Sequence, residues 1–315
     1  MIEQDYKPKQ KLTDGIWKDV PIETYHSDCC DGKSVSKSAL KSLIPVHGGS
    51  PKRFYGHWAC NPNQIDPKPP SEALIFGKAA HCLVLGDEVF REKFIVRPEM
   101  APDGKAWNGN NKSCKEWLAL AEKSGLMVLK PEQLIRINNM VEDLAEYPLV
   151  KQGMLNGRVE RTLIAKDPAT GIYLKFRPDV IPTDDGMFAD LKTTSSLDED
   201  FLAKQIGDMG YYLQGAMGRM VCRLLDIPFD EFWLIYALND EVPDTAHARI
   251  SEFELDRGEK VIRWCLDTIA GCLESGDWYG ARPFSGGERD IHMKPWTATA
   301  LDDFLTHNSP ETAAA

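Results

Sequence analysis

Apolar residues recur at intervals of three or four along most of the first half of the chain, and this spacing predicts helices. A Ser-rich start followed by such a repeat predicts a capped amphipathic helix near 36–44. A mostly apolar helix is expected over 74–90, and two more over 113–124 and 131–146, the last opening with Pro131. The N-terminal portion is therefore predicted to be mainly helical.

The pattern changes near residue 158, where short runs typical of β-strands alternate with turn sequences. The turns are Asp-Pro-Ala-Thr-Gly at 167–171 and Pro-Thr-Asp-Asp-Gly at 182–186. Three consecutive antiparallel strands are expected, at 158–166, 172–181 and 187–192.

Helical spacing returns over 198–225 and 255–273, and the apolar run 231–238 between them suits a buried strand. We therefore expect an α/β fold, with a mixed central β-sheet flanked by helices and an N-terminal helical portion. The chain is divided into a loose lead-in, a single domain and a flexible tail. Their expected bounds are 1–21, 22–295 and 296–315.

The composition excludes several classes of protein. With 315 residues, 43% hydrophobic and 27% charged, the chain can bury a large core, which excludes a disordered or fibrous protein. No apolar run approaches the roughly 20 residues that a bilayer requires, and a basic-then-apolar leader is lacking. We therefore expect a cytoplasmic protein with no membrane partner. Eight irregularly spaced cysteines indicate reduced thiols rather than a disulfide scaffold.

The net charge of −11 argues against a protein that coats nucleic acid through its overall charge. It does not exclude DNA binding, because a nuclease can confine positive charge to one groove. One locally basic stretch could contact phosphates or form a solvated helix face. It comprises Lys33, Lys37, Lys41, Lys52 and Arg53.

Candidate chemistry is concentrated around two aspartates. Asp179 and Asp190 lie near the ends of successive predicted strands, so the hairpin between them can bring the carboxylates together. Lys192 follows Asp190 by two positions, which places both side chains on one face of a strand. A surface ion pair is the ordinary explanation of such a pair. However, the flanking residues are apolar, and buried carboxylates favour a compensating Mg²⁺ or Mn²⁺ ion, which indicates phosphodiester hydrolysis.

These residues belong to a wider set of motifs, including Gly-Lys-Ala-Ala-His at 77–81, Arg-Pro-Asp at 177–179 and Asp-Leu-Lys at 190–192. The sequence resembles the RecE-type exodeoxyribonuclease VIII branch of the PD-(D/E)xK nucleases over roughly residues 22–295. The other matching segments are 25–26, 35–40, 82–85, 94–99, 167–172, 193–194 and Gln214.

The resemblance implies roles for individual residues. The implied metal ligands are His81, Asp179, Asp190 and the backbone carbonyl of Leu191. The implied catalytic residues are Asp179, Asp190, Lys192, Glu160 and Gln214. Without the resemblance, His81 would be taken as a core histidine, and Glu160 as a solvent-facing residue paired with Arg158 or Arg161.

One position departs from the family pattern. The family has a tyrosine four residues after the glutamine, whereas this chain has Gly218. Tyr211 or Tyr212 could supply the missing ring from another turn, although both could also pack on the sheet. Trp107, in a Gly/Asn-rich loop, could stack on separated bases or pack on its own protein.

The function implied by the resemblance is a Mg²⁺-dependent 5′-to-3′ exodeoxyribonuclease, with Mn²⁺ as a substitute. It would degrade one strand of linear double-stranded DNA and leave 3′ single strands for a single-strand annealing protein. A homo-oligomeric ring, trimer or tetramer, is implied as well. The alternatives are a structure-specific or sequence-specific endonuclease on the same scaffold, and a catalytically silent DNA-binding recombination protein.

Overall fold

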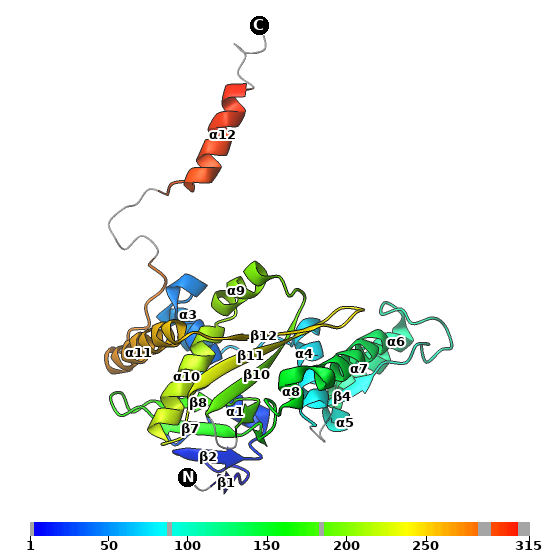
Figure 1. Cartoon of the computed structure of the whole chain (residues 1–315), viewed down its shortest axis with the longest axis horizontal. Coiled ribbons are helices and arrows are strands. Elements are labelled where there is room, and N and C mark those ends of the chain that lie inside the picture. The colour runs from blue at the N-terminus through cyan, green and yellow to red at the C-terminus, as the bar shows by residue number, and fades with distance from the viewer. Residues whose placement is uncertain (1–2, 87–89, 183–185, 283–290, 308–315) are drawn as a thin grey trace.

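The central part of the molecule is a mixed β-sheet structure flanked by helices, as the sequence predicts (Figure 1). The structure is a computed structural model and describes residues 3–86, 90–182, 186–282 and 291–307. The strands are β1 Glu3–Asp5, β2 Gly15–Lys18, β3 Ser34–Ser36, β4 Phe94–Val96, β5 Met127–Leu129, β6 Arg158–Val159, β7 Thr162–Lys166, β8 Tyr173–Phe176, β9 Val180–Ile181, β10 Met187–Thr194, β11 Glu231–Leu238 and β12 Thr245–Arg249.

Helices cover both sides of the strands. They are α1 Ile22–His26, α2 Lys37–Lys41, α3 Pro51–His57, α4 Glu72–Val84, α5 Phe90–Lys93, α6 Lys112–Lys123, α7 Pro131–Glu146, α8 Pro148–Lys151, α9 Glu199–Asp208, α10 Tyr211–Leu224, α11 Glu252–Ser275 and α12 Pro295–His307, with a 3₁₀ turn η1 at Pro45–His47.

The larger sheet has the strand order β1-β2-β7-β8-β3, and the second sheet has the order β10-β11-β12. Both sheets are mixed. In the larger one β2, β7 and β8 pair antiparallel while β3 pairs parallel with β8. In the second one β10 pairs parallel with β11, which pairs antiparallel with β12.

The first residues of the chain differ from the expected loose lead-in. Strand β2 pairs antiparallel with β7, and β1 pairs with β2, so this segment adds the edge of the larger sheet. Leu12 and Trp17 are buried there. The strands have three and four residues, which is too short for an alternating pattern to stand out from a charged sequence.

The prediction of three consecutive antiparallel strands is wrong for the third strand. The first two split into a β7–β8 hairpin and a short β6–β9 ladder. Pro178, which has no N–H for a ladder, lies between β8 and β9, and Glu160, at φ 51°, lies between β6 and β7. Strand β10 pairs with β11, and helices α9 and α10 make the crossover that a parallel pair requires.

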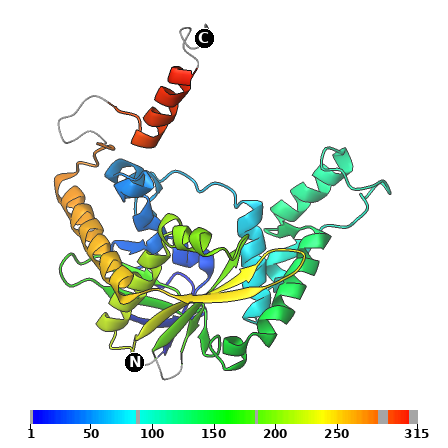
Figure 2. The ribbon, with the colours of Figure 1, turned by 45° about the horizontal axis from the view of Figure 1, so that its top comes forward.

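Strand β10 lies between two hydrophobic cores. Phe188 belongs to the core that α10 and α11 form with the strands, whereas Ala189 and Leu191 belong to the core formed with α4 and α7. Figure 2 shows these helix pairs on opposite sides of the strands. Because successive side chains alternate between faces, Asp190 and Lys192 are directed toward α10.

Part of the segment expected to be a flexible tail is helical. Residues 295–307 form α12, which lies apart from the body in both views (Figures 1 and 2), while residues 308–315 lie outside the described part. None of the residues of α12 is buried. Within the described ranges, no helix combines the length and the apolar character needed to cross a bilayer. None of the eight cysteines, all within the described ranges, forms a disulfide.

Candidate active site

The two predicted aspartates lie together. Asp179 precedes β9, and its Oδ2 accepts a hydrogen bond of 2.6 Å from the backbone N–H of Leu191 on β10. The Asp179 side chain is 14% exposed, whereas that of Asp190 is only 2% exposed. The contact brings the segments of both carboxylates together, although β9 and β10 are not paired as a hairpin.

Asp190 is held by two side chains, one on each carboxylate oxygen. Lys192 Nζ forms an ion pair with Oδ2, and Gln214 Nε2 on α10 donates to Oδ1 at 2.6 Å. The Lys192 ammonium also lies 5.0 Å from the centroid of the Tyr211 ring. Asp190 and Lys192 therefore share one face of β10, as their spacing predicts.

His81 reaches the same cluster from α4. Its Nδ1 lies 3.4 Å from Asp179 Oδ1. Helix α4 begins after Ser71, whose side chain accepts from the N–H of Leu74, and it approaches β10 closely at Gly77. A Cβ at Gly77 would lie 3.3 Å from Thr193 Oγ1. The glycine thus permits the close approach that places the histidine, one turn later, beside the carboxylate.

Glu160 borders the cluster through its backbone and its side chain. Its N–H donates to the Asp179 carbonyl at 2.9 Å, and its carboxylate accepts from Arg177 at 2.8 Å. The partner is not Arg158 or Arg161, the two that the sequence suggested, because both of those pair with Glu3. Arg177 also donates to the carbonyl of Val20.

The environment shifts the pKa values of the central groups. Burial alone would raise the pKa of Asp179, but His81, Lys192 and the Leu191 N–H more than compensate, so the pKa is lowered and the group is ionised at neutral pH. Burial lowers the pKa of Lys192 to about 8 despite the attraction of Asp179. The protein therefore holds the Asp179 carboxylate and the Lys192 ammonium in a site that water reaches poorly.

A pocket of about 230 Å³ lies beside the cluster, with Asp179 and Gln214 in its lining. Its lining includes Ser36, Lys37, Glu160, Arg177, Asp179 and Gln214. His26 also lines it, and burial together with neighbouring cations, Lys175 foremost, lowers the pKa of this imidazole to about 4. The wall of the pocket thus combines three cationic side chains, those of Lys37, Lys175 and Arg177, with the carboxylates of Glu160 and Asp179.

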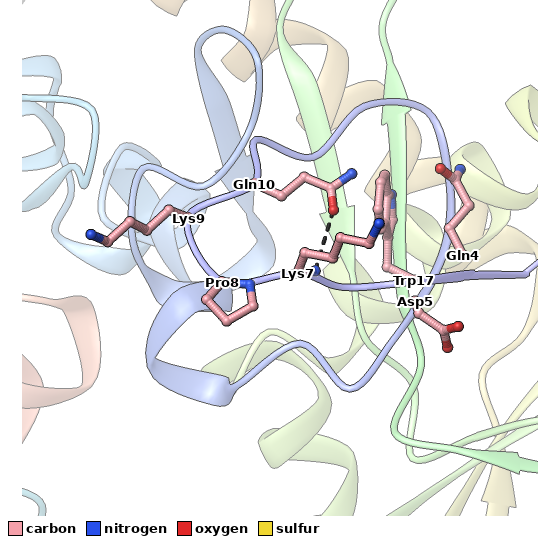
Figure 3. Close-up of a pocket in the computed structure, with 7 residues that line it drawn as sticks. All are labelled: Gln4, Asp5, Lys7, Pro8, Lys9, Gln10 and Trp17. Atoms are coloured by element: carbon pink, nitrogen blue, oxygen red, sulfur yellow. Dashed lines mark hydrogen bonds between the residues drawn. The ribbon is translucent and has the colours of Figure 1, made fainter.

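A second pocket, of about 620 Å³, lies in the N-terminal segment between β1 and β2 (Figure 3). Figure 3 shows Gln10, Lys7 and Trp17 around it, with the Lys7 N–H bonded to Gln10. No residue of α4, β9, β10 or α10 contributes to its lining. Despite its size, this pocket is therefore separate from the predicted chemistry.

The donor atoms of the cluster suit a hard divalent cation. Two carboxylates and one imidazole are present, and the Leu191 carbonyl remains a predicted fourth ligand. Within the described ranges, however, no three His, Cys, Asp or Glu side chains are already placed to hold a metal ion. Both oxygens of Asp190 contact Lys192 and Gln214 instead. Each carboxylate oxygen has a second lone pair, so these contacts leave Asp190 with acceptor sites for a cation.

The three aromatic residues considered for DNA or site contacts, Tyr211, Tyr212 and Trp107, lie in different environments. The Tyr211 ring lies beside Lys192 and Lys37. Tyr212 contacts His47 instead, with 3.3 Å between Tyr212 Oη and His47 Nε2. Trp107 packs edge-on against Trp117 at 5.4 Å and lies under Arg97, so it docks on its own protein.

Comparisons with known proteins agree with the fold. Residues 36–281 match the family described as "PDDEXK-like domain of unknown function (DUF3799)". A crystal structure of a candidate exonuclease from Eubacterium rectale aligns with 90% of this chain and 98% of the other, at 16% identity and a TM-score of 0.55. At that identity the likeness shows the fold alone.

A crystal structure of a phage related exonuclease from Haemophilus somnus 129PT also aligns, with 63% of this chain and 95% of the other. The identity is 13% and the TM-score is 0.30, a value too low to support an argument. A search of curated proteins finds no match to the chain.

Proposed function

This chain belongs to the PDDEXK-like DUF3799 family, and we propose that it is a divalent-cation-dependent DNA nuclease. The observation that carries the proposal is the arrangement around Asp190. A buried carboxylate is flanked by Lys192 and Gln214 and lies next to a second carboxylate that faces His81. Such a cluster is costly to bury, and a merely structural role would not require it.

Each residue of the cluster would have a distinct role. His81, Asp179, Asp190 and the Leu191 carbonyl would hold the cation. When bound, the cation would supply Lewis-acid polarisation of the phosphodiester and a lowered pKa of bound water. Lys192 donates hydrogen bonds at the position where negative charge develops on phosphate oxygens.

Two further residues position these groups. Gln214 fixes the rotation of the Asp190 carboxylate, since its amide donates to one oxygen only. Glu160 holds the Asp179 segment through its backbone N–H, and its side chain orients Arg177.

The finer activity rests on the sequence resemblance to the RecE-type exodeoxyribonuclease VIII branch. We propose that the enzyme uses Mg²⁺, with Mn²⁺ as a substitute, and degrades one strand of linear double-stranded DNA in the 5′-to-3′ direction. The 3′ single strands would serve recombination through a single-strand annealing protein. A trimeric or tetrameric ring would keep the enzyme on its DNA.

One assay tests the reaction and its direction. Linear duplex labelled at the 5′ or the 3′ end is incubated with the protein in Mg²⁺, in Mn²⁺ and in chelator. We expect early release of the 5′ label with metal and no release with chelator. Activity in chelator, or no hydrolysis with either metal, would overturn the nuclease proposal, whereas early 3′ release would overturn only the direction.

Two additional experiments distinguish this function from the alternatives. An endonuclease would cleave circular duplex DNA, which an end-dependent enzyme leaves intact. A silent binding protein would hydrolyse neither substrate. In the active protein, Asp190→Asn is expected to abolish hydrolysis while the fold persists, and Asp200→Asn, on the exposed face of α9, serves as the matched control.

A further inference from the structure

Lys37 is a half-buried cation beside the candidate active site that the proposed chemistry does not use. It begins α2, lines the same pocket as Asp179 and Gln214, and lies 5.6 Å from the centroid of the Tyr211 ring. We propose that Lys37 binds a phosphate group of the DNA strand next to the bond being cleaved. The inference rests on the proposed nuclease function, because it assigns a substrate contact to that site.

The two lysines that line the pocket, Lys37 and Lys175, differ in their hydrogen-bond partners. The Lys175 ammonium, with three N–H donors, faces the carbonyl of Tyr25 at 2.6 Å, the carbonyl of Ser27 at 3.0 Å and Cys29 Sγ at 3.9 Å. Lys37 has one such contact, to the carbonyl of Met209 at 3.3 Å. In the part of the chain that the structure describes, no carboxylate pairs with Lys37, so two of its donors remain for a ligand.

The charges around Lys37 also favour an anion. Lys37 and Lys192 both lie against the Tyr211 ring, at 5.6 and 5.0 Å. Lys192 has Asp190 as its counter-ion, but Lys37 has no equivalent in the described residues. Besides burial, the Lys37 charge helps to lower the pKa of Lys192, so the two ammonium groups repel each other, and an anion between them would offset that repulsion. A phosphate oxygen would provide that charge and would reach the pocket together with the scissile bond.

Neighbouring hydroxyl groups supply further donors of the kind that phosphate contacts use. Ser36 and Ser38 line the pocket on either side of Lys37 in the sequence. Ser36 occupies the N-cap position of α2, yet its side chain makes no capping hydrogen bond. Burial and the nearby Lys41 lower the pKa of Lys37 to about 8, as expected of an ammonium held without a counter-ion.

A structural role for Lys37 gives a different expectation. Lys37 and Lys41 both donate to backbone carbonyls at the C-terminal end of α9, those of Met209 and Asp208. If Lys37 served only to hold that end, replacing either lysine would have the same effect. Lys41 does not line the pocket, which makes it the matched control.

The test measures DNA binding and its salt dependence in the full chain carrying Asp190→Asn, with Lys37→Gln, Lys37→Arg or Lys41→Gln added. A phosphate contact contributes about one unit to the slope of log Kd against log salt concentration. We expect Lys37→Gln to weaken binding about tenfold and to lower the slope by about one. Lys37→Arg should restore both, and Lys41→Gln should change neither.

Kinetics in the otherwise unchanged enzyme provide an independent readout. Lys37→Gln is expected to raise KM for DNA more than it lowers kcat, and the melting temperature should match that of Lys41→Gln. Comparing 5′-phosphate with 5′-hydroxyl duplexes identifies the phosphate. A defect only with 5′-phosphate ends indicates the terminal group, and an equal defect indicates an internal phosphodiester.

An unchanged salt slope in Lys37→Gln, or the same loss in Lys41→Gln, would overturn the inference. These results remain distinct from failure of the proposed function, which would appear as lack of metal-dependent hydrolysis by the unmodified protein. Even then, the measurements of DNA binding and its salt dependence would show whether Lys37 contacts phosphate.

Discussion

The backbone N–H of Leu191 on β10 donates to Oδ2 of Asp179 across 2.6 Å, although Asp179 immediately precedes β9, a strand of a different sheet. This bond, with the His81 contact on the other oxygen, fixes the orientation of the Asp179 carboxylate. The adjacent Asp190 is fixed by Lys192 and Gln214. Both carboxylates are thus oriented by the protein itself, which is the preorganisation that electrostatic catalysis requires.

Gln214 provides the first prediction. Gln214→Leu removes the amide that donates to Asp190 Oδ1 and leaves a buried carboxylate oxygen without that partner. We expect a loss of about 1–3 kcal/mol in the free energy of unfolding and a fall in kcat of about tenfold or more. Urea denaturation and hydrolysis of labelled duplex measure the two effects. Gln152→Leu, at an exposed position after α8, should change neither.

Gly218 provides a prediction about packing. A Cβ at Gly218 would lie 2.6 Å from Cζ of Phe176, so Gly218→Ala should destabilise the fold by about 1–3 kcal/mol. Gly271 lies in α11 with open space around its Cα. Gly271→Ala is therefore expected to be neutral or to stabilise by up to about 1 kcal/mol. Equal effects of the two substitutions on the melting temperature would contradict the packing argument.

The Asp167–Arg263 pair gives a pH-dependent prediction. Asp167 is buried, and Arg263 and Thr170 lower its pKa although burial opposes them. A lowered pKa in the folded state means that the stabilisation is complete above the unfolded value, about 3.9. It is lost as the pH falls through the folded value.

Arg263→Met is therefore expected to reduce the free energy of unfolding by about 1.5–3 kcal/mol at pH 7. The difference from the unmodified protein should shrink below about pH 4. Urea denaturation at pH 7, 5 and 3 measures it. A difference that stays constant across this range would show that the ionised Asp167 is not what Arg263 stabilises.

Histidine 81 gives a prediction about the cation. Replacing His81 with Ala removes the imidazole beside Asp179. If the imidazole is a ligand, the concentration of Mg²⁺ or Mn²⁺ needed for half-maximal hydrolysis should rise by about 10–100-fold. Asp179→Asn should have a similar or larger effect. His57→Ala, on α3, is the control that should leave the metal requirement unchanged.

Local sequence patterns predicted much of the fold and the central part of the site. The expected helices 113–124 and 131–146 and the strand 231–238 agree with α6, α7 and β11, because each has a long periodic or continuous apolar run. Asp190 and Lys192 share a face because a strand has a period of two.

Other features depend on contacts between distant segments. The pairing of β10 with β11 is not visible locally, because a turn sequence before β10 resembles that of a hairpin. The partner of Glu160 is Arg177, which a pattern of neighbouring charges cannot select.

The departure at Gly218 has a similar explanation. The Phe176 ring from β8 occupies the space that a side chain at this position would need. The ring of Tyr211, at the start of the same helix, lies beside Lys192. Only the three-dimensional packing shows why the glycine is compatible with an intact cluster.

The alternation along β10 limits how this stretch of the gene can evolve. Phe188 packs in one core, Ala189 and Leu191 in the other, and Asp190 faces α10. A codon inserted or deleted here would exchange the two faces and drive Asp190 into hydrocarbon. Natural variants should therefore differ by substitution alone between Met187 and Thr194, with the length of the segment unchanged.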